Sequence, residues 1–244
     1  QNEVNVKALF LMGKGITVNN RFAGFYSPMN LIPTFGMPAS DNAYAVGLGE
    51  PGRTIAFPVG RLAANTPTHV MTYLNKVKET ESFAYDDLWK KNVFHISGGL
   101  TPLEQSSFTN IMNNELRPKI QGPYMGASVS TFNKSSNQTI EYVDMRAVLN
   151  RGISLLNLFG HSSRTSPDVE IGQASDPTQG FNNAGKYPLV IVNGCFTGNI
   201  YEADQSLYEN WIFTPNKGAV MFWAASDEGL SANLRRHINT FYDM

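Results

Sequence analysis

Short apolar runs alternate with longer amphipathic stretches along most of the chain. The apolar runs predict strands at 6–12, 54–61, 92–97, 152–159, 189–192 and 218–225. Several of these runs are unbroken, as expected for strands buried on both faces of a parallel sheet. Pro58 marks the second run as an edge strand or the site of a bulge, and residues 139–143 alternate in polarity like a half-exposed strand.

The amphipathic stretches predict helices that begin near Pro67, Pro102, Asp144, Ser206 and Ser231. In the first of them Thr66 is the expected N-cap, since its hydroxyl can accept from the first turn and a proline follows it. Val70, Leu74 and Val77 recur at helical spacing and should face the core, with Lys76 largely opposite.

The second and the last helix carry their own start and stop signals. The second should present Phe108, Met112 and Leu116 to the core and stop at Pro118. The last should begin with Ser231 as its N-cap. Residues 218–225 lie between these two helices and form the last of the apolar runs. We therefore expect them to be the last buried strand.

Alternating strands and helices predict an α/β class with three layers, α/β/α, around a mainly parallel sheet. Residues 82–91 have the character of a hinge, so we expect an N-terminal α/β subdomain at 1–90 and a second subdomain at 91–244. The first residue is Gln1 and the last residues continue a helical pattern, which suggests a piece of a longer protein with flanking domains.

Composition narrows the classes of function. Hydrophobic residues make up 42% of the 244, enough for a proper core. The net charge is −1 and the basic residues are scattered, so nucleic acid is not an expected partner. No apolar run approaches the roughly 20 residues of a membrane span.

Cys195 is the only cysteine, and it lies just beyond the strand at 189–192. The carboxyl edge of an open α/β sheet is where ligands bind and reactive groups are presented. A lone cysteine is more often a small buried hydrophobe. A single cysteine also excludes an internal disulfide framework and a thiolate metal cluster.

His161 follows the strand at 152–159 in the same way that Cys195 follows its own. If the two strands are neighbours in a parallel sheet, about 5 Å apart, thiol and imidazole meet at one edge. That pairing is a nucleophile with its base. Each residue alone has a commoner structural explanation, so the prediction rests on the pair.

Two other candidates carry weaker signals. Gly13 and Gly15 flank Lys14 after the first strand, but the remaining positions of a phosphate-binding loop are absent. Asp41 could cap a helix, form a turn or bind a cation, and the turn is the commonest of the three.

Five segments together resemble the gingipain-type cysteine peptidases, whose catalytic unit is caspase-like. They span nearly the whole chain in family order, at 40–44, 59–62, 150–161, 188–195 and 217–220. The resemblance implies a Cys-His dyad in a secreted or cell-surface bacterial protein. Some members act as sortases in type IX secretion.

By this resemblance Cys195 is the nucleophile, His161 the base, and the backbone N–H groups of Ser162 and Cys195 form the oxyanion hole. Family members often have glycine where this chain has Ser162, a change that keeps the backbone donor. A glutamate that steadies the histidine in gingipains has no counterpart at Ser97-Gly98-Gly99, and Glu104 is the nearest acid. The chemistry requires no metal, although gingipain relatives often hold structural calcium.

The leading hypothesis is therefore a cysteine endopeptidase that forms an acyl-enzyme on peptide or protein substrates. The alternative is a caspase-like scaffold or binding module of a secretion or surface complex that has lost turnover, which the missing acid favours. An α/β-hydrolase is excluded because no Gly-x-Ser-x-Gly motif occurs.

Three acids are candidates for the substrate pocket, because each follows a predicted strand at the same sheet edge. They are Asp227 and Glu228, after the strand at 218–225, and Glu104, after the strand at 92–97. A carboxylate there would favour cleavage after Arg or Lys. A small or polar residue before the scissile bond is the alternative.

Overall fold

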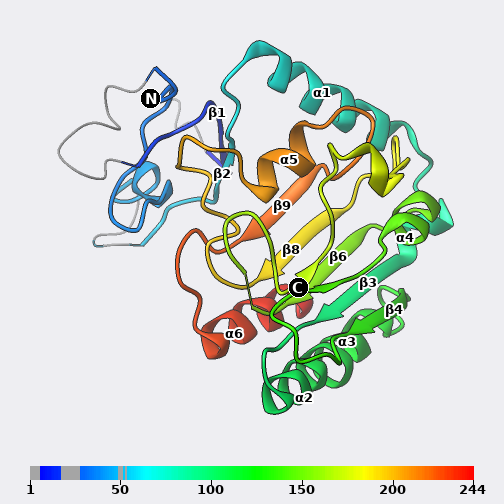
Figure 1. The fold of residues 1–244 in the computed structure, drawn as a ribbon. Coiled ribbons are helices and arrows are strands. Elements are labelled where there is room, and N and C mark those ends of the chain that lie inside the picture. Colours follow the sequence, from blue (N-terminus) through cyan, green and yellow to red (C-terminus); the bar gives the residue numbers. More distant parts are fainter. Residues whose placement is uncertain (1–5, 18–27, 49–51, 53) are drawn as a thin grey trace. The chain divides into compact units, whose positions relative to one another are not determined.

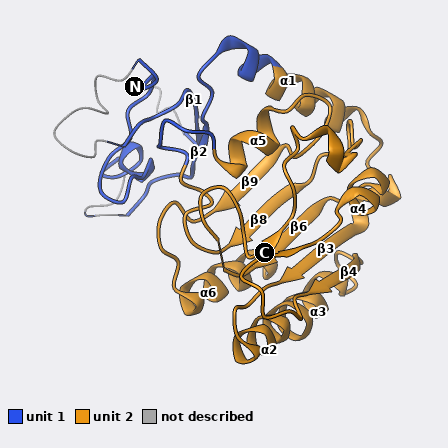
Figure 2. Cartoon of the chain, in the orientation of Figure 1, with its two compact units in different colours: residues 1–71, 200–205 blue, residues 72–199, 206–244 orange. Residues whose placement is uncertain are grey.

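The computed structural model describes residues 6–17, 28–48, 52 and 54–244. These residues form two compact units, one comprising Gln1–Met71 with Ile200–Gln205 and the other Thr72–Asn199 with Ser206–Met244 (Figure 2). The boundary between the units falls within helix α1 (Pro67–Ser82). The division into subdomains at residue 90 stays a prediction.

The larger unit is built on a five-stranded sheet with the order β4-β3-β6-β8-β9. All four neighbouring pairs are parallel (Figure 1). The strands are β3 (Asn92–Ser97), β4 (Ser128–Asn133), β6 (Leu155–Phe159), β8 (Leu189–Asn193) and β9 (Met221–Ala224). β3, β6 and β8 are almost completely buried, as their largely apolar runs predict.

Helices cover both faces of this sheet, so the predicted three-layer α/β/α class is confirmed (Figure 1). One face carries α2 (Pro102–Asn110), the π-helix η3 (Ile111–Leu116), α3 (Arg117–Gln121) and α6 (Ser231–Tyr242). The other carries α4 (Arg146–Arg151) and α5 (Leu207–Phe213). The 3-10 turns η2 (Leu88–Lys91) and η4 (Pro177–Gln179) and the parallel pair β5 (Glu141–Tyr142) and β7 (Val169–Glu170) complete the unit.

The core beneath α2, η3 and α6 is apolar. Phe108, Met112 and Leu116 are each at most 5% exposed, which confirms the stripe predicted for the second helix. Phe159 and Ile191 meet this stripe from the sheet. None of the helices in the described ranges is both long and apolar enough to cross a membrane.

The second helical stretch does not end at Pro118 as predicted. The π-helix η3 shifts the hydrogen-bond pattern, so that the Arg117 N–H bonds to the Met112 carbonyl and α3 starts anew. Pro118 therefore lies in the first turn of α3, where a missing N–H costs nothing. The helical path continues to Gln121.

Lys76 is buried in α1, contrary to the predicted solvent-facing position. Its Nζ donates to the carbonyls of Trp211, Lys217 and Ala219 at 2.9, 2.6 and 3.2 Å. Leu74, assigned to the core by spacing, is 39% exposed. Helical spacing cannot foresee a lysine that satisfies carbonyls far away in the sequence. The Thr66 cap is confirmed by its bond from the His69 N–H at 3.2 Å.

Two further predictions about the last elements are wrong. β9 is an edge strand rather than a buried one, and its Met221 and Trp223 are 53% and 42% exposed. An apolar run alone does not distinguish the edge of a sheet from its middle. Ser231 is the first residue of α6 and not its cap, because Leu230 takes the N-cap position with no side-chain cap bond.

In the smaller unit, β1 (Leu9–Met12) pairs in parallel with β2 (Val59–Leu62). β2 begins after Pro58 and so is shorter than the predicted strand. Beside the 3-10 turn η1 (Asn42–Tyr44), Asp41 forms a two-point ion pair with Arg61, both N···O distances being 2.7 Å. Asp41 also accepts from Tyr201 at 3.1 Å. Its cation is therefore Arg61.

A directional chain of buried hydrogen bonds crosses the sheet beneath α6. His95 Nδ1 lies 3.2 Å from the Met112 carbonyl, which can only accept, so Nδ1 carries the proton. His95 Nε2 then accepts from the Tyr242 hydroxyl at 2.8 Å. Asn157 donates to that hydroxyl at 2.9 Å and accepts from Asn193 at 2.8 Å. The chain ends two residues before Cys195.

This network makes stability depend on pH. Burial lowers the pKa of His95 to about 4, against 6.5 for an ordinary imidazole. Between these values the unfolded chain binds a proton that the folded one does not, so stability falls as the pH drops from about 6.5 to about 4. We expect this group to remove on the order of 3 kcal/mol from the free energy of unfolding, measured by urea titration at each pH.

His95→Gln keeps a donor and an acceptor but does not titrate, so its stability should change less over the same interval. His237→Gln, at an exposed histidine, is the matched control and should follow the wild type. Parallel curves for wild type and His95→Gln would show that His95 does not resist protonation.

Candidate active site

The register of β6 and β8 decides where His161 and Cys195 lie. The two strands pair in parallel from Leu155↔Leu189 to Phe159↔Asn193. His161 and Cys195 each lie two residues beyond that last pair, at the same edge of the sheet. The predicted neighbourhood of the two strands is therefore confirmed, and both side chains are partly exposed there.

The Cys195 thiol lies against the loop that follows β9. The Gly229 N–H is 3.4 Å from Sγ, and the Gly229 carbonyl is 3.9 Å from it. Two backbone bonds hold this loop, Phe196 N–H to the Asp227 carbonyl at 3.1 Å and Gly198 N–H to the Ala225 carbonyl at 2.8 Å. The thiol is therefore presented between the ends of β8 and β9.

The residue after Cys195 has a strained backbone. Phe196 has φ 61°, and the Thr197 N–H bonds to the Cys195 carbonyl at 2.8 Å across it. A left-handed bulky residue inside such a three-residue turn is uncommon and costs energy. Strain of this kind concentrates at functional sites, where surrounding contacts maintain it.

The imidazole of His161 faces a carboxylate. His161 Nε2 lies 3.2 Å from Glu104 Oε1, and the two side chains are 37% and 36% exposed. Nε2 has no well-aligned hydrogen-bond partner among the described residues, so the contact is an ion pair when the imidazole is protonated. The ring of Phe108 packs against the imidazole at a centroid distance of 5.5 Å.

The fold of α2 fixes Glu104. Thr101 and Glu104 form a capping box, in which Glu104 Oε2 accepts from the N–H groups of Leu100 and Thr101 at 2.9 and 3.1 Å. Burial alone would raise the pKa of Glu104, but these two donors and His161 together lower it. The nearest acid in the sequence thus lies beside His161.

Two side-chain hydrogen bonds join the two loops of the site. Ser162 Oγ donates to the Cys195 carbonyl at 2.7 Å, and Thr197 Oγ1 donates to the Ser163 carbonyl at 3.1 Å. Within the described part of the chain, no hydrogen bond takes up the backbone N–H groups of Ser162 or Cys195. Both predicted oxyanion donors are therefore unoccupied.

Asp168 is buried beside the candidate site, and the sequence analysis did not identify it. Its carboxylate accepts from the Gly99 N–H at 2.7 Å and lies 3.6 Å from Lys134 Nζ, which is also buried. Burial raises the pKa of Asp168, while the Gly99 N–H, Lys134 and His161 offset part of that rise. The only sequence signal was the glycines that follow two strands, Gly98 and Gly160.

Those glycines have a steric reason. A Cβ on either Gly98 or Gly160 would come within 2.2 Å of Asp168 Oδ1. The carboxylate therefore occupies the space that two side chains would fill, between the ends of β3 and β6. His161 follows Gly160 directly, so this packing sets the start of its loop.

Asp227 and Glu228 lie in the loop that contacts Cys195. Asp227 accepts from the Glu228 N–H at 2.9 Å, and Glu228 is exposed. Glu104 lies instead on the His161 side. The three predicted acids are thus divided between the two flanks of the pair.

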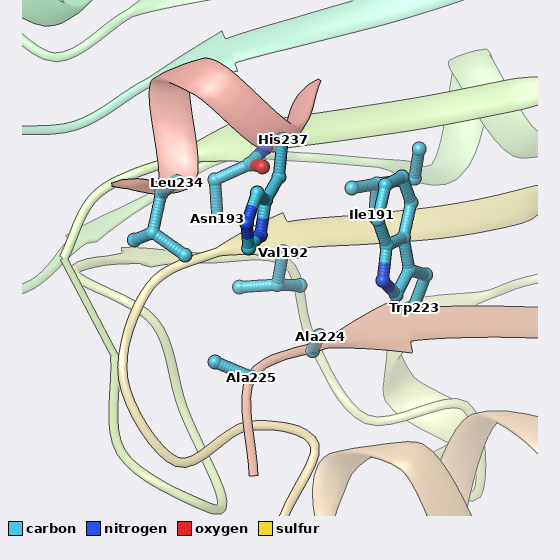
Figure 3. A pocket seen from close by; sticks show the side chains of 8 residues that line it. All are labelled: Ile191, Val192, Asn193, Trp223, Ala224, Ala225, Leu234 and His237. Carbon is cyan, nitrogen blue, oxygen red and sulfur yellow. The ribbon is translucent and has the colours of Figure 1, made fainter. Parts of the chain in front are cut away.

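A small hollow of about 80 Å³ opens between α6 and the ends of β8 and β9 (Figure 3). Its wall is largely apolar, and His237 borders it. The hollow contains neither Cys195 nor His161. No cluster of three or more potential metal-binding His, Cys, Asp or Glu side chains occurs in the described ranges.

Comparisons with known proteins agree with this fold. The model of peptidase family C25 matches residues 1–244. The crystal structure of the Arg-specific cysteine proteinase gingipain R (RgpB) superposes with a TM-score of 0.73 at 16% identity, over 98% of this chain and 54% of that chain. A complex of the pro- and mature domains of RgpB from Porphyromonas gingivalis gives a TM-score of 0.72 at 16% identity, with the same coverage.

A third structure, described only as a protease, superposes with a TM-score of 0.59 at 20% identity, over 92% of this chain and 46% of that one. The chain thus spans about half the length of the structures that it matches. No curated protein sequence matches it.

Packing around Asp168 leads to a testable consequence. Gly160→Ala places a methyl group 2.2 Å from Asp168 Oδ1, so either the loop that carries His161 or the Asp168 carboxylate must move. We expect a loss of about 1–3 kcal/mol in the free energy of unfolding, the usual cost of overpacking. Urea titration measures it.

Gly60→Ala is the control, because its Cβ would meet nothing closer than the Phe10 ring at 3.5 Å. In an Asp168→Ala background the cost of Gly160→Ala should shrink. An equal cost in both backgrounds would contradict the assigned clash.

Proposed function

Because the chain belongs to peptidase family C25, we propose that it is a cysteine endopeptidase in which Cys195 and His161 form the catalytic dyad. The observation that carries the proposal is the parallel register of β6 and β8, which delivers both residues to one sheet edge. The strained turn after Cys195 and the carboxylate facing His161 support it.

Proton transfer uses the imidazole nitrogen that is free to face the thiol. Glu104 faces Nε2, so we assign Nδ1 to the Cys195 proton. The thiolate then attacks the carbonyl carbon of the scissile peptide bond. The imidazolium returns its proton to the leaving amine, and the acyl group remains on Sγ.

The oxyanion is held by backbone donors. The N–H groups of Ser162 and Cys195, which no partner in the described chain occupies, are the donors we assign. The Ser162 hydroxyl keeps the two loops together by its bond to the Cys195 carbonyl. Water, activated by His161, attacks the acyl-enzyme and releases the acid product and the thiol.

Glu104 acts on His161 as a positioning residue rather than as a wall of the substrate pocket. Its carboxylate is held by two backbone donors and the imidazole, which leaves it little capacity for a substrate cation. This acid fills the role that seemed vacant in the sequence. The rival hypothesis, a scaffold that has lost turnover, loses the observation that favoured it.

The substrates we propose are peptides or proteins, and the resemblance suggests a bacterial protein that is secreted or on the cell surface, including a role in type IX secretion. One matched structure is a complex of pro- and mature domains. A pro-domain and other flanking domains are thus partners that we propose for the full-length protein.

Active-site variants test the proposal on a panel of fluorogenic peptides. We expect Cys195→Ala and His161→Ala each to lower kcat/KM at least about 100-fold, since nucleophile and base act as one unit. Glu104→Gln should lower kcat less than either, with KM unchanged, and Glu104→Asp should restore part of the loss.

More than about a tenth of the wild-type rate in Cys195→Ala or His161→Ala would overturn the dyad. A Glu104→Gln change confined to KM would instead place Glu104 against the substrate.

The acids beside Cys195 set the expected preference for the residue before the scissile bond. Asp227 and Glu228 lie in the loop that touches the thiol, so we propose cleavage after Arg or Lys. The double variant Asp227→Asn/Glu228→Gln should lower kcat/KM for basic substrates about tenfold relative to neutral ones.

Glu81→Gln/Asp86→Asn removes two exposed acids elsewhere and is the matched control. Equal rates for basic, neutral and acidic substrates in the wild type would reject a charged pocket. A small or polar preference would then replace it.

A further inference from the structure

An open cavity of about 340 Å³ lies beside His161. Its volume is within the range of pockets that bind small ligands or side chains. Besides His161, Ser162 and Asp168, its lining comprises Leu100, Thr139, Ile140, Ser163, Ser166 and Pro167. His161 and Ser162 belong to the proposed catalytic machinery, but none of the roles assigned above uses Leu100, Ile140 or the other side chains of this wall.

The order of the strands locates the cavity relative to the dyad. Leu100 follows β3, residues 139–140 follow β4, and residues 161–168 follow β6. No lining residue comes from the segments after β8 or β9, where Cys195 and its neighbouring loop lie. Apart from Ser162, whose hydroxyl bonds to the Cys195 carbonyl, the lining therefore lies on the β3 and β4 side of His161, opposite to the β8 side that carries Cys195.

The chemistry of peptide cleavage indicates which part of the substrate passes that side of His161. The nucleophile bonds to the carbonyl carbon, whereas the imidazolium protonates the amine that leaves. The substrate segment carrying that amine must therefore pass on the imidazole side. Residues after the scissile bond are the ones that reach this cavity.

The lining favours an uncharged side chain. Leu100 and Ile140 are 43% and 50% exposed and offer apolar contact. The Ser166 hydroxyl donates to Glu170, and the Ser163 hydroxyl donates to the Ser166 carbonyl at 3.1 Å. Asp168 is buried and already bonded to the Gly99 N–H. Its Oδ1 has no hydrogen-bond partner among the described residues, but the side chain is 6% exposed and lies 3.6 Å from Lys134 Nζ, so it offers little accessible charge to a ligand in the cavity.

We propose that this cavity is a specificity subsite for an uncharged, aliphatic or hydroxyl-bearing side chain on the leaving-group side of the scissile bond, with Ile140 and Leu100 as its determinants. The inference rests on the proposed peptidase function. Such a subsite selects the substrate residue after the scissile bond, in addition to any selection of the residue before it.

Cleavage of a proteome-derived peptide library by the full-length protein tests the subsite, with both sides of each cut read by mass spectrometry. The wild type should favour uncharged residues within the first positions after the cut. Ile140→Glu should enrich Lys and Arg there about fivefold, and Ile140→Lys should enrich Asp and Glu equally, as expected for an exposed ion pair. Leu100→Glu repeats the test from a second wall residue.

Leu88→Glu is the matched control. Leu88 is 83% exposed in η2, which precedes β3 at the opposite end of the strand. Its profile should equal that of the wild type. The residue before the cut should also stay unchanged in every variant, and each variant that cuts the library reports its own folding.

Unchanged preferences after the cut in both Ile140 variants would overturn the subsite while leaving the peptidase intact. A charge-dependent shift before the cut would also overturn it, because the cavity would then serve the acyl side. A library left uncut by the wild type, at the level of Cys195→Ala, would overturn the proposed function itself.

Discussion

The parallel register between β6 and β8 is the constraint on which the site depends. Main-chain hydrogen bonds fix the two strands side by side up to the pair Phe159↔Asn193, so the residues just beyond must emerge together. A slip of one residue would turn His161 or Cys195 to the other face. Both faces of the two strands are buried, and the Asn193 side chain donates to Asn157 across them, which helps to hold that register. The placement of His161 and Cys195 at the sheet edge thus depends on packing in the middle of the sheet.

Beneath the edge, a buried carboxylate takes the place of side chains. Asp168 fills the space left by Gly98 and Gly160, and Lys134 and a backbone N–H compensate for its burial. An unpaired charge at this depth would be costly, so the pair holds only as a unit. It ties the ends of β3 and β6 to the loop that carries His161.

The two flanks of this sheet edge present different kinds of side chain. The β9 side carries the exposed acid Glu228 and the Asp227 loop that touches the thiol, whereas the β3 and β4 side offers Leu100 and Ile140. The dyad that we propose lies between these flanks. A peptide crossing the edge at the proposed dyad would therefore meet exposed acidic residues on the β9 side, and apolar walls together with the His161-bound Glu104 on the β3 side.

Sequence alone determined four of the five strands of the large sheet, their parallel class and the arrival of His161 and Cys195 at one sheet edge, because apolar runs and strand-end positions are local signals with a fixed geometric outcome. Only the tertiary structure decided which groups the polar side chains contact. Lys76 bonds carbonyls more than a hundred residues away, Asp168 enters a gap between two strand ends, and Glu104 turns to His161 through a cap at the start of α2. Periodicity reports which face of an element is apolar. It does not report which distant polar group will meet that face, since long-range contacts depend on how all the elements pack together.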